Sequence, residues 1–335
     1  MKHRNFGRTG VKVSELCLGC MMFGGKTTPE DSYDIIDKAI DAGINFLDTA
    51  NVYSRGRSEE VTGEALVRNG KRHQIVLATK VHGTMADDDP NMQGNSRRHI
   101  IQQAEASLKR LQTDYIDLYQ IHRPQSDIPI DETLRALDDL VTAGKVRYIG
   151  TSTFSAWQVM ESLWTSKELG LNRFVCEQQP YHILDRRVER ELMPMARTYG
   201  IATIPWSPLA GGLLTGKYTR NAPPPPDSRF ADFENNPMQK RRMVEQVYDV
   251  NETLVPMAEA RGCTVAQLAL AWVNQQPGVT SPIIGPRTMA QLEDNLGAID
   301  VTLTEEELAV IDGLVPPGSM VSPFYQADWG PHLYR

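Results

Sequence analysis

YIDLYQIHRPQSDIPIDETLRALDDLVTAGKVRYIGTST, residues 115–153, contains two short apolar runs separated by a helical pattern. The runs are YIDLYQIH (115–122) and VRYIGTST (146–153), and the segment between them is amphipathic and reaches a glycine just before the second run. A glycine there is typical of a helix that ends and turns back into a sheet. The stretch therefore predicts a strand, a crossover helix and a second, parallel strand.

The same alternation extends along the rest of the chain. Six further apolar runs are SELCLGCM (14–21), INFLDTA (44–50), QIVLATKV (74–81), RFVCEQQP (173–180), IATIPWSP (201–208) and TSPIIG (280–285). Eight parallel strands with helices between them are the number that closes a (β/α)8 barrel. An open doubly wound sheet is the alternative, but no G-x-G-x-x-G follows the first run. We therefore predict an α/β fold, a (β/α)8 TIM barrel that forms one domain over residues 1–335.

Additions to the barrel are predicted at both ends of the chain. KHRNFGRTGVKVS indicates an N-terminal hairpin that turns at Gly-Arg-Thr-Gly, and we expect it to cover the barrel floor. Thr304-x-x-Glu307 is a capping box and predicts a C-terminal helix, followed by a tail. A long irregular piece over about residues 211–237 contains PPPP and would overhang the carboxyl ends of the strands.

Composition excludes several kinds of partner. The 335 residues are 41% hydrophobic and 23% charged, which allows a large core. A net charge of −7 argues against nucleic acid or an acidic membrane surface as partner. The start lacks the apolar region of a signal peptide, and no run approaches the roughly 18 apolar residues that span a bilayer. Four scattered cysteines do not make a disulfide scaffold, so we expect a reducing, cytoplasmic location.

Cys17 and Cys20 have a C-x-x-C spacing that can indicate zinc or redox chemistry. They fall in a strand-like run, where residues three apart point to opposite faces, and no second pair at metal-ligand spacing accompanies them. We therefore predict two packed thiols and no metal site.

Polar side chains follow three consecutive predicted strands at their carboxyl ends, where barrel enzymes have their active sites. Asp48, with Tyr53 five residues later, follows the second strand, and Lys80 and His122 mark the ends of the third and fourth. Each alone has a structural explanation: a cap, a lysine that reaches solvent, a loop-ordering histidine. Together they make a proton donor, because an ammonium lowers the pKa of a phenol and a carboxylate compensates the ammonium. A histidine beside them can orient a carbonyl oxygen, so the group suits reduction of a carbonyl by hydride.

Over nearly its full length the sequence resembles the aldo-keto reductase superfamily, in the bacterial type related to the potassium-channel β-subunit branch. GINFLDTANVYSRGRSEEVTGEAL is similar to the first signature of that family, with Asp48 and Tyr53 in the matching places. LATKV carries Lys80 and DYIDLYQIHRP carries His122, which completes the catalytic tetrad. The resemblance implies NADPH or NADP across the barrel mouth, with NADH as a weaker alternative, and reduction of a small-molecule aldehyde or ketone to the alcohol.

The resemblance also implies a set of cofactor contacts. They are Gly19, Cys20 and Met21 after the first strand, with Asp48; Ser152, Thr153 and Gln178 at the nicotinamide amide; Trp206 on its ring; Ser207, Leu209, Gly211, Lys217 and Arg229 around the diphosphate; and Gly285, Arg287, Gln291, Asp294 and Asn295 at the adenosine end. Independently, Gly285-Pro-Arg287 opening a helix predicts free backbone N–H groups beside a cation, which is a phosphate site. No acidic residue lies between Gly285 and Gln291, so we expect NADPH to be preferred over NADH.

Substrate contacts are expected from Tyr53, His122 and Arg123. Met21, Met22 and Phe23 would supply part of an apolar wall, and the tail residues Gln326, Asp328 and Trp329 would add further contacts. This mixture fits a small hydroxylated, sugar-derived aldehyde better than a steroid. The sequence predicts no oligomeric state.

Three alternative functions compete with carbonyl reduction. Potassium-channel β subunits share the fold and cofactor site, so a non-catalytic nicotinamide-binding regulatory subunit is one; in them the histidine position is altered, whereas His122 is present here. A Schiff-base aldolase using Lys80 is the second. The third is a reductase of carbon–carbon double bonds, because a steroid-reducing branch carries Glu where His122 stands.

Overall fold

A computed structural model describes residues 1–325, and strands and helices alternate through it. The barrel strands are β3 (Cys17–Gly19), β4 (Phe46–Asp48), β5 (Val76–Val81), β6 (Ile116–Ile121), β7 (Val146–Ser152), β8 (Cys176–Gln178), β9 (Ala202–Thr203) and β10 (Ile283–Ile284). The helices are α1 (Pro29–Asp41), α2 (Arg57–Asn69), α3 (Arg97–Arg110), α4 (Ile130–Thr142), α5 (Ala156–Leu169), α6 (Leu192–Tyr199), α7 (Pro237–Arg242), α8 (Glu245–Arg261), α9 (Val265–Gln275), α10 (Met289–Leu296) and α11 (Glu305–Leu314). Each barrel strand lies inside one of the eight predicted apolar runs.

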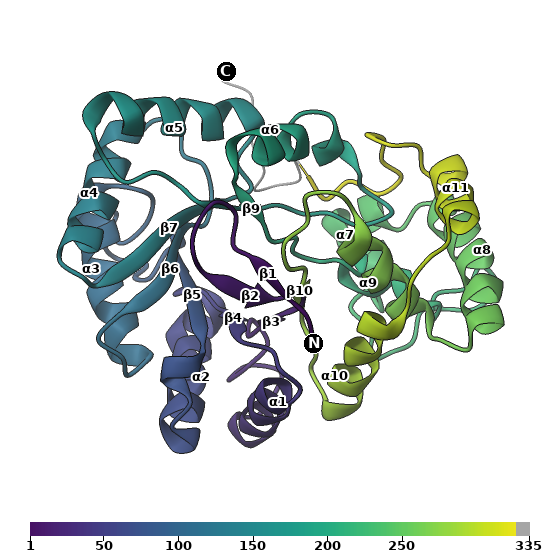
Figure 1. Ribbon diagram of the computed structural model, residues 1–335. Helices are drawn as coiled ribbons and strands as arrows, with labels where there is room; N and C mark the ends of the chain where they lie inside the picture. The colour runs from purple at the N-terminus through teal and green to yellow at the C-terminus, as the bar shows by residue number, and fades with distance from the viewer. Residues whose placement is uncertain (326–335) are drawn as a thin grey trace.

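The eight strands form one parallel sheet in the order β10-β3-β4-β5-β6-β7-β8-β9. Its two edges meet through backbone hydrogen bonds: Thr280 N donates to Thr203 O (2.9 Å), and Ile283 N donates to Pro205 O (2.8 Å). These bonds bring the sheet around on itself, with the helices outside it (Figure 1). The predicted (β/α)8 fold is confirmed.

Helix ends follow the signals in the sequence. α5 and α6 both stop at a glycine, Gly170 (φ 66°) and Gly200 (φ 67°), in the left-handed conformation that other residues rarely adopt. Thr304 caps α11 with the predicted reciprocal bonds to Glu307. Among residues 1–325, no helix is both long and apolar enough to cross a bilayer.

The N-terminal hairpin lies over one end of the barrel. β1 (His3–Asn5) and β2 (Lys12–Ser14) pair antiparallel, and Figure 1 shows them in front of the barrel strands. Phe6 in the turn is buried and packs edge-on against Phe46, with ring centroids 5.6 Å apart. It shares a buried cluster with Cys17 of β3, so the hairpin closes the floor and access is left at the carboxyl ends of the strands.

The irregular piece between β9 and α8 is fixed at several points, although it has little regular structure. Tyr218 and Phe230 are both buried, with their rings in an edge-to-face contact 5.8 Å apart. Arg220 makes ion pairs with three carboxylates of α8, those of Glu245, Asp249 and Glu252. The segment then reaches the loop after β10, where Asp227 O lies 3.5 Å from Arg287 Nη2. It therefore spans the carboxyl-terminal side of the barrel from β9 to β10.

Candidate active site

A buried ion pair lies at the end of β4 and β5. Lys80 Nζ donates to Asp48 Oδ1 at 2.5 Å and to Thr49 O at 2.7 Å, and the lysine side chain has no exposed surface. Burial alone would lower the pKa of Lys80, but attraction to Asp48 and Tyr53, with hydrogen bonds to both, outweighs burial and raises it. The ammonium therefore stays charged at neutral pH.

Two amides hold the other oxygen of Asp48. Gln120 Nε2 and Gln178 Nε2 each donate to Asp48 Oδ2 at 3.0 Å, and Gln178 Nε2 also lies 3.2 Å from Gln120 Oε1. All of these side chains are buried. The carboxylate is thus bonded on both oxygens and keeps one orientation under Lys80.

Tyr53 and His122 complete the predicted tetrad. Tyr53 begins a short 3-10 helix, and its ring centroid lies 5.1 Å from Lys80 Nζ. The His122 ring meets it edge-on, with centroids 5.6 Å apart and planes at 82°. Burial, and then repulsion from Arg123 and Lys80, lowers the pKa of His122 well below its ordinary value. The imidazole is therefore neutral at pH 7, and the structure brings all four residues together.

Arg123, expected to contact substrate, is directed at the loop after β7. Its Nη1 donates to His122 O at 2.8 Å and to Thr153 Oγ1 at 2.7 Å, and it lies 3.4 Å from Ser152 Oγ. Thr153 has a left-handed φ of 63°, which costs a non-glycine residue energy. Arg123 therefore orders Ser152 and Thr153, two of the three residues predicted to face the nicotinamide amide.

Glu177 is a buried acid beneath the same loop that the sequence analysis did not single out. Its Oε1 accepts from Phe154 N at 3.1 Å, while Oε2 has no hydrogen-bond partner among residues 1–325. Burial raises the pKa of Glu177 to about 8, so the carboxyl is largely protonated at neutral pH.

Lys217, Arg229 and Arg287 lie near one another on the side of the barrel mouth opposite the tetrad. Burial, and then repulsion from Arg287 and Arg229, lowers the pKa of Lys217; burial and repulsion from Arg287 likewise lower that of Arg229. Within residues 1–325, none of the three forms an ion pair with a carboxylate. Like charges gathered without an internal counter-ion attract anions, so these three residues could hold a polyanion.

Two glycines shape the surface against which these cations lie. Gly211 (φ 66°) and Gly212 (φ 106°) are left-handed. A Cβ on Gly211 would lie 3.3 Å from Arg229 Cδ, and one on Gly212 3.4 Å from Lys217 Nζ. Ser207 just before them is also left-handed, at φ 54°, and Leu209 O accepts from Gly212 N. The turn is therefore tight, and no side chain stands between its backbone and the cations.

At the start of α10 the structure corrects one expectation. The free N–H of Arg287 inferred from sequence is occupied, because it donates to Gln291 Oε1 at 2.8 Å. Gln291 thus acts as part of the cap with Thr288. Asp294 accepts from Thr264 Oγ1 at 2.9 Å, and Asn295 is buried. The backbone N–H of Arg287 is therefore not free, and its guanidinium group is the part that could contact a phosphate.

The remaining predicted contacts lie at the barrel mouth or just below it. Gly19 ends β3 where it meets β10, and a Cβ there would fall 2.7 Å from Ile283 Cγ2. Cys20 is buried, with burial raising the pKa of its thiol to about 12, so only its backbone could face a ligand.

The residues expected to form an apolar wall or to stack on the cofactor differ in exposure. Met21 is exposed and Trp206 is partly exposed. Phe23 is fully buried and belongs to the core, not to a pocket wall. Gly285 is exposed in the loop before α10. Gln326, Asp328 and Trp329 lie outside the described residues.

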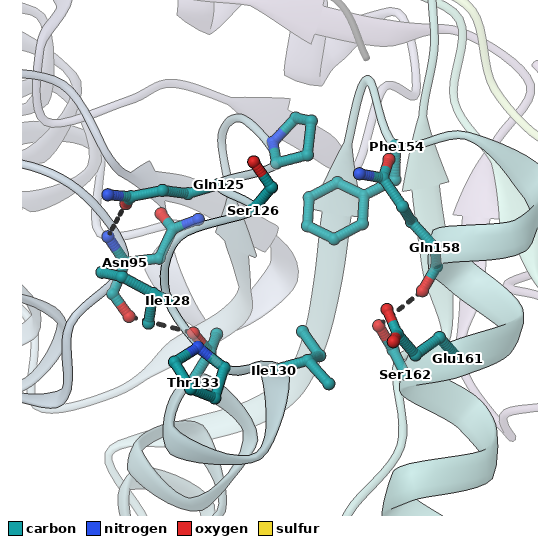
Figure 2. A pocket seen from close by; sticks show the side chains of 12 residues that line it. Asn95, Gln125, Ser126, Ile128, Ile130, Thr133, Phe154, Gln158, Glu161 and Ser162 are labelled. Atoms are coloured by element: carbon teal, nitrogen blue, oxygen red, sulfur yellow. Dashed lines mark hydrogen bonds between the residues drawn. The ribbon is translucent and has the colours of Figure 1, made fainter. Parts of the chain in front are cut away.

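Two cavities lie among the loops that follow β5, β6 and β7, and none of the four tetrad residues lines either of them. One, of about 120 Å³, lies between the loop after β6 and helix α5, with Gln125 and Phe154 on facing walls (Figure 2). Some of its polar groups are bonded to one another: Asn95 N donates to Gln125 Oε1, and Ser162 Oγ donates to Gln158 O. The other is a cleft of about 520 Å³ between the loops after β5 and β6. None of the substrate contacts expected from sequence lies in the loop after β5.

Gln120 is a second residue of the site that sequence reasoning missed. It stands two positions before His122 in an apolar strand, so strand alternation places both side chains on the same face. β5 and β6 also pair with Lys80 opposite Gln120. The polar amide of Gln120, in an apolar strand and in register with Lys80, was the sequence signal that could have identified it.

Comparisons with known proteins agree with this geometry. Residues 15–316 match the Aldo/keto reductase family. An uncharacterized oxidoreductase of Bacillus subtilis (strain 168), YrpG, is 39% identical over 335 residues, 97% of this chain and 99% of that protein. A probable voltage-gated potassium channel subunit beta of Arabidopsis thaliana is 40% identical over 304 residues, 90% of this chain and 92% of its own length. One of Oryza sativa subsp. japonica is 38% identical over 320 residues, 94% and 97% of the two chains. The family expected from the motifs is confirmed: the chain belongs to the aldo/keto reductase family.

Proposed function

We propose that the protein is an enzyme that reduces an aldehyde or ketone to the alcohol with NADPH as reductant. The observation that carries this proposal is the contact set of Lys80, whose buried ammonium joins Asp48 to Tyr53 while the neutral His122 ring stands against the tyrosine. A phenol with an ammonium on one side and an open mouth on the other is a proton donor.

The residues present fit a nicotinamide dinucleotide. Trp206 and the amides and hydroxyls after β7 and β8 would hold the nicotinamide, and Lys217, Arg229 and Arg287 would hold the phosphates. Their unmet charge favours NADPH over NADH, because the 2′-phosphate adds negative charge where Arg287 stands. When bound, the cofactor supplies hydride from nicotinamide C4.

Each member of the tetrad has a separate task. His122, neutral, donates one hydrogen bond to the carbonyl oxygen without adding a charge. Tyr53 gives its phenolic proton to that oxygen as negative charge develops on it, and Lys80 stabilises the phenolate left behind. Asp48, fixed by two glutamines, keeps Lys80 protonated. Solvent then returns a proton to Tyr53.

The surroundings of Lys80 count against a Schiff-base aldolase. A Schiff-base lysine must present a neutral amine, which requires a lowered pKa. Here the pKa of Lys80 is raised and its Nζ is occupied by Asp48 and Thr49. Because the relatives include channel subunits, a regulatory nicotinamide-binding subunit is the second candidate, and turnover decides between the two. The free cysteines Cys17, Cys20, Cys176 and Cys263 support a cytoplasmic location.

Tyr53→Phe tests the proposal. It removes the proton and keeps the ring, so turnover in a screen of NADPH oxidation against sugars, aromatic aldehydes and ketoacids should fall by about 10²–10⁴-fold. NADPH affinity, measured by fluorescence titration, should stay near wild type. A variant as active as wild type would show that Tyr53 is not the donor, and no turnover by wild type on any carbonyl would favour the regulatory subunit.

A further inference from the structure

The turn after β7, residues 152–155, holds a strained residue in one conformation. Thr153 has a φ of 63°, in the left-handed region that strains a non-glycine residue. Its N donates to Gln178 O at 3.0 Å, and Phe154 N donates to Glu177 Oε1 at 3.1 Å. Such a conformation persists only where the surrounding structure fixes it. These bonds to β8, the strand beside the turn, are therefore part of what keeps the turn in this shape.

A further bond to the same turn comes from the C-terminal segment, residues 319–325. Tyr325 Oη donates to Phe154 O at 3.1 Å, and both residues are buried. Burial raises the pKa of Tyr325, so the phenol keeps its proton and is the donor in this bond. The two residues are 171 positions apart in the sequence. The turn is thus held both by β8 and by a segment that follows α11.

Asp185, in the loop after β8, anchors this segment. Its carboxylate is buried, and Oδ2 accepts from Phe324 N and Tyr325 N, each at 2.7 Å. Arg187 donates to both carboxylate oxygens, at 2.9 and 2.7 Å, and also to Tyr325 O. A carboxylate that accepts from two successive backbone N–H groups fixes the residues that carry them. Asp185 therefore sets the position from which the Tyr325 side chain reaches the turn.

Phe324, the residue before Tyr325, packs against a different part of the site. Its ring centroid lies 6.4 Å from that of Trp206, and it meets the His182 ring edge-on at 4.4 Å. Burial lowers the pKa of His182 to about 3, so this imidazole is neutral and packs as an uncharged ring. Successive residues of one anchored segment thus contact both parts of the protein that are expected to hold the nicotinamide, Trp206 and the turn after β7.

We propose that Tyr325, anchored by Asp185, is a positioning residue for the nicotinamide end of the cofactor. Its bond to Phe154 O keeps the turn in the conformation that meets the nicotinamide amide before the cofactor arrives. Without this bond the strained turn relaxes in the free protein, and affinity falls with the fraction of molecules that keep the competent shape. The assignment rests on the proposed function, because it requires a nicotinamide dinucleotide at the barrel mouth.

The test compares two ligands, NADP and 2′-phospho-ADP-ribose, which is NADP without its nicotinamide. Tyr325→Phe removes the hydroxyl and keeps the ring. It should weaken NADP binding about five- to tenfold, the size expected for one lost hydrogen bond, and leave binding of 2′-phospho-ADP-ribose unchanged, both measured by calorimetry. A merely structural role would not separate the two ligands.

Tyr119→Phe is the matched control. The Tyr119 phenol is also buried and donates to a backbone carbonyl, Ile100 O at 3.3 Å. Its removal should leave both affinities unchanged. Asp185→Asn tests the anchor, because it keeps the size of the side chain and removes the charge that holds Arg187. It should show the same selective loss of NADP affinity.

Other outcomes separate this inference from the proposed function. Equal losses for both ligands, or NADP binding by Tyr325→Phe as tight as by wild type, would overturn the positioning role. If wild type reduces a carbonyl in that case, the proposed function still stands. A selective loss of NADP affinity in a protein that reduces no carbonyl would uphold the role of Tyr325 and refute the proposed reduction alone.

Discussion

The two sides of the barrel mouth differ in whether their charged side chains are paired within the protein. At β4, β5 and β6, the buried Lys80 is paired with Asp48, and both carboxylate oxygens are bonded. Across the mouth, Lys217, Arg229 and Arg287 repel one another and meet no carboxylate within residues 1–325. The first set has its counter-charge within the protein, whereas the second has none among residues 1–325.

This difference matches the two tasks proposed for these residues, proton donation by the tetrad and phosphate binding by the three cations. A proton donor must keep its pKa whether or not ligand is present, so its charges are compensated internally. A phosphate site gains affinity from charge that has no internal partner, and the folded protein carries the cost of that repulsion until the anion arrives. Substitutions in the two sets should therefore have opposite effects on stability.

The largest effect is expected from Lys80→Met. It should abolish measurable turnover and also lower the free energy of unfolding by about 3–5 kcal/mol, because Asp48 is left buried without its cation. Adding Asp48→Asn should restore most of the stability and none of the activity. Urea unfolding and NADPH oxidation on the same preparations check both parts. Full stability in the single variant would contradict the compensation described here.

A smaller loss should follow from Arg287→Ala. NADPH affinity should fall about 10- to 100-fold, NADH affinity should hardly change, and stability should stay the same or rise as repulsion with Lys217 and Arg229 is relieved. Fluorescence titration with both dinucleotides measures the first part and thermal unfolding the second. Arg135→Ala, which removes an exposed cation on α4, is the matched control. Equal losses for NADPH and NADH would mean that Arg287 only holds the segment at Asp227.

Glu177 is a third case, in which a buried acidic group is protonated and therefore uncharged. With a pKa raised from 4.5 to about 8, it is protonated when folded and ionised when unfolded between those values. Its contribution is therefore complete below pH 4.5 and is lost as pH rises through about 8. The stability of wild type relative to Glu177→Gln should decline between pH 5 and 8 by at most about 1.4 kcal/mol per pH unit. Urea unfolding at several pH values measures this, and a constant difference would show that Glu177 is ionised in the fold.

Sequence reasoning predicted much of this arrangement, because the fold places its chemistry at strand ends. Asp48, Lys80 and His122 were identified from their positions near the carboxyl ends of apolar runs, without a view of their contacts. Gln120 was missed because the sequence does not show what a single glutamine in a buried strand bonds to. Its acceptor is Asp48, at the end of β4.

Residues that depend on distant contacts were harder to assign. Glu177 adjoins Gln178 in the sequence but accepts from the backbone of Phe154, and only burial shows that it is protonated. Arg123 was predicted to contact substrate, and its hydrogen bond to Thr153 in the loop after β7 could not be predicted from the sequence. In both cases the partner comes from another loop, which spacing along the chain cannot specify.

Closure of the barrel has a consequence for how the chain folds. β10, near the end of the chain, pairs with β3, near its beginning, and its flanking residues bond to β9. Until residues 283–284 are in place, the growing sheet has two open edges with unpaired N–H and C=O groups, which are prone to pair with other chains. Contacts between residues so far apart in sequence form slowly. The interval between synthesis of β9 and docking of β10 is therefore when this protein is most exposed to aggregation, and a chain that stops short of β10 should need a chaperone more than the complete one.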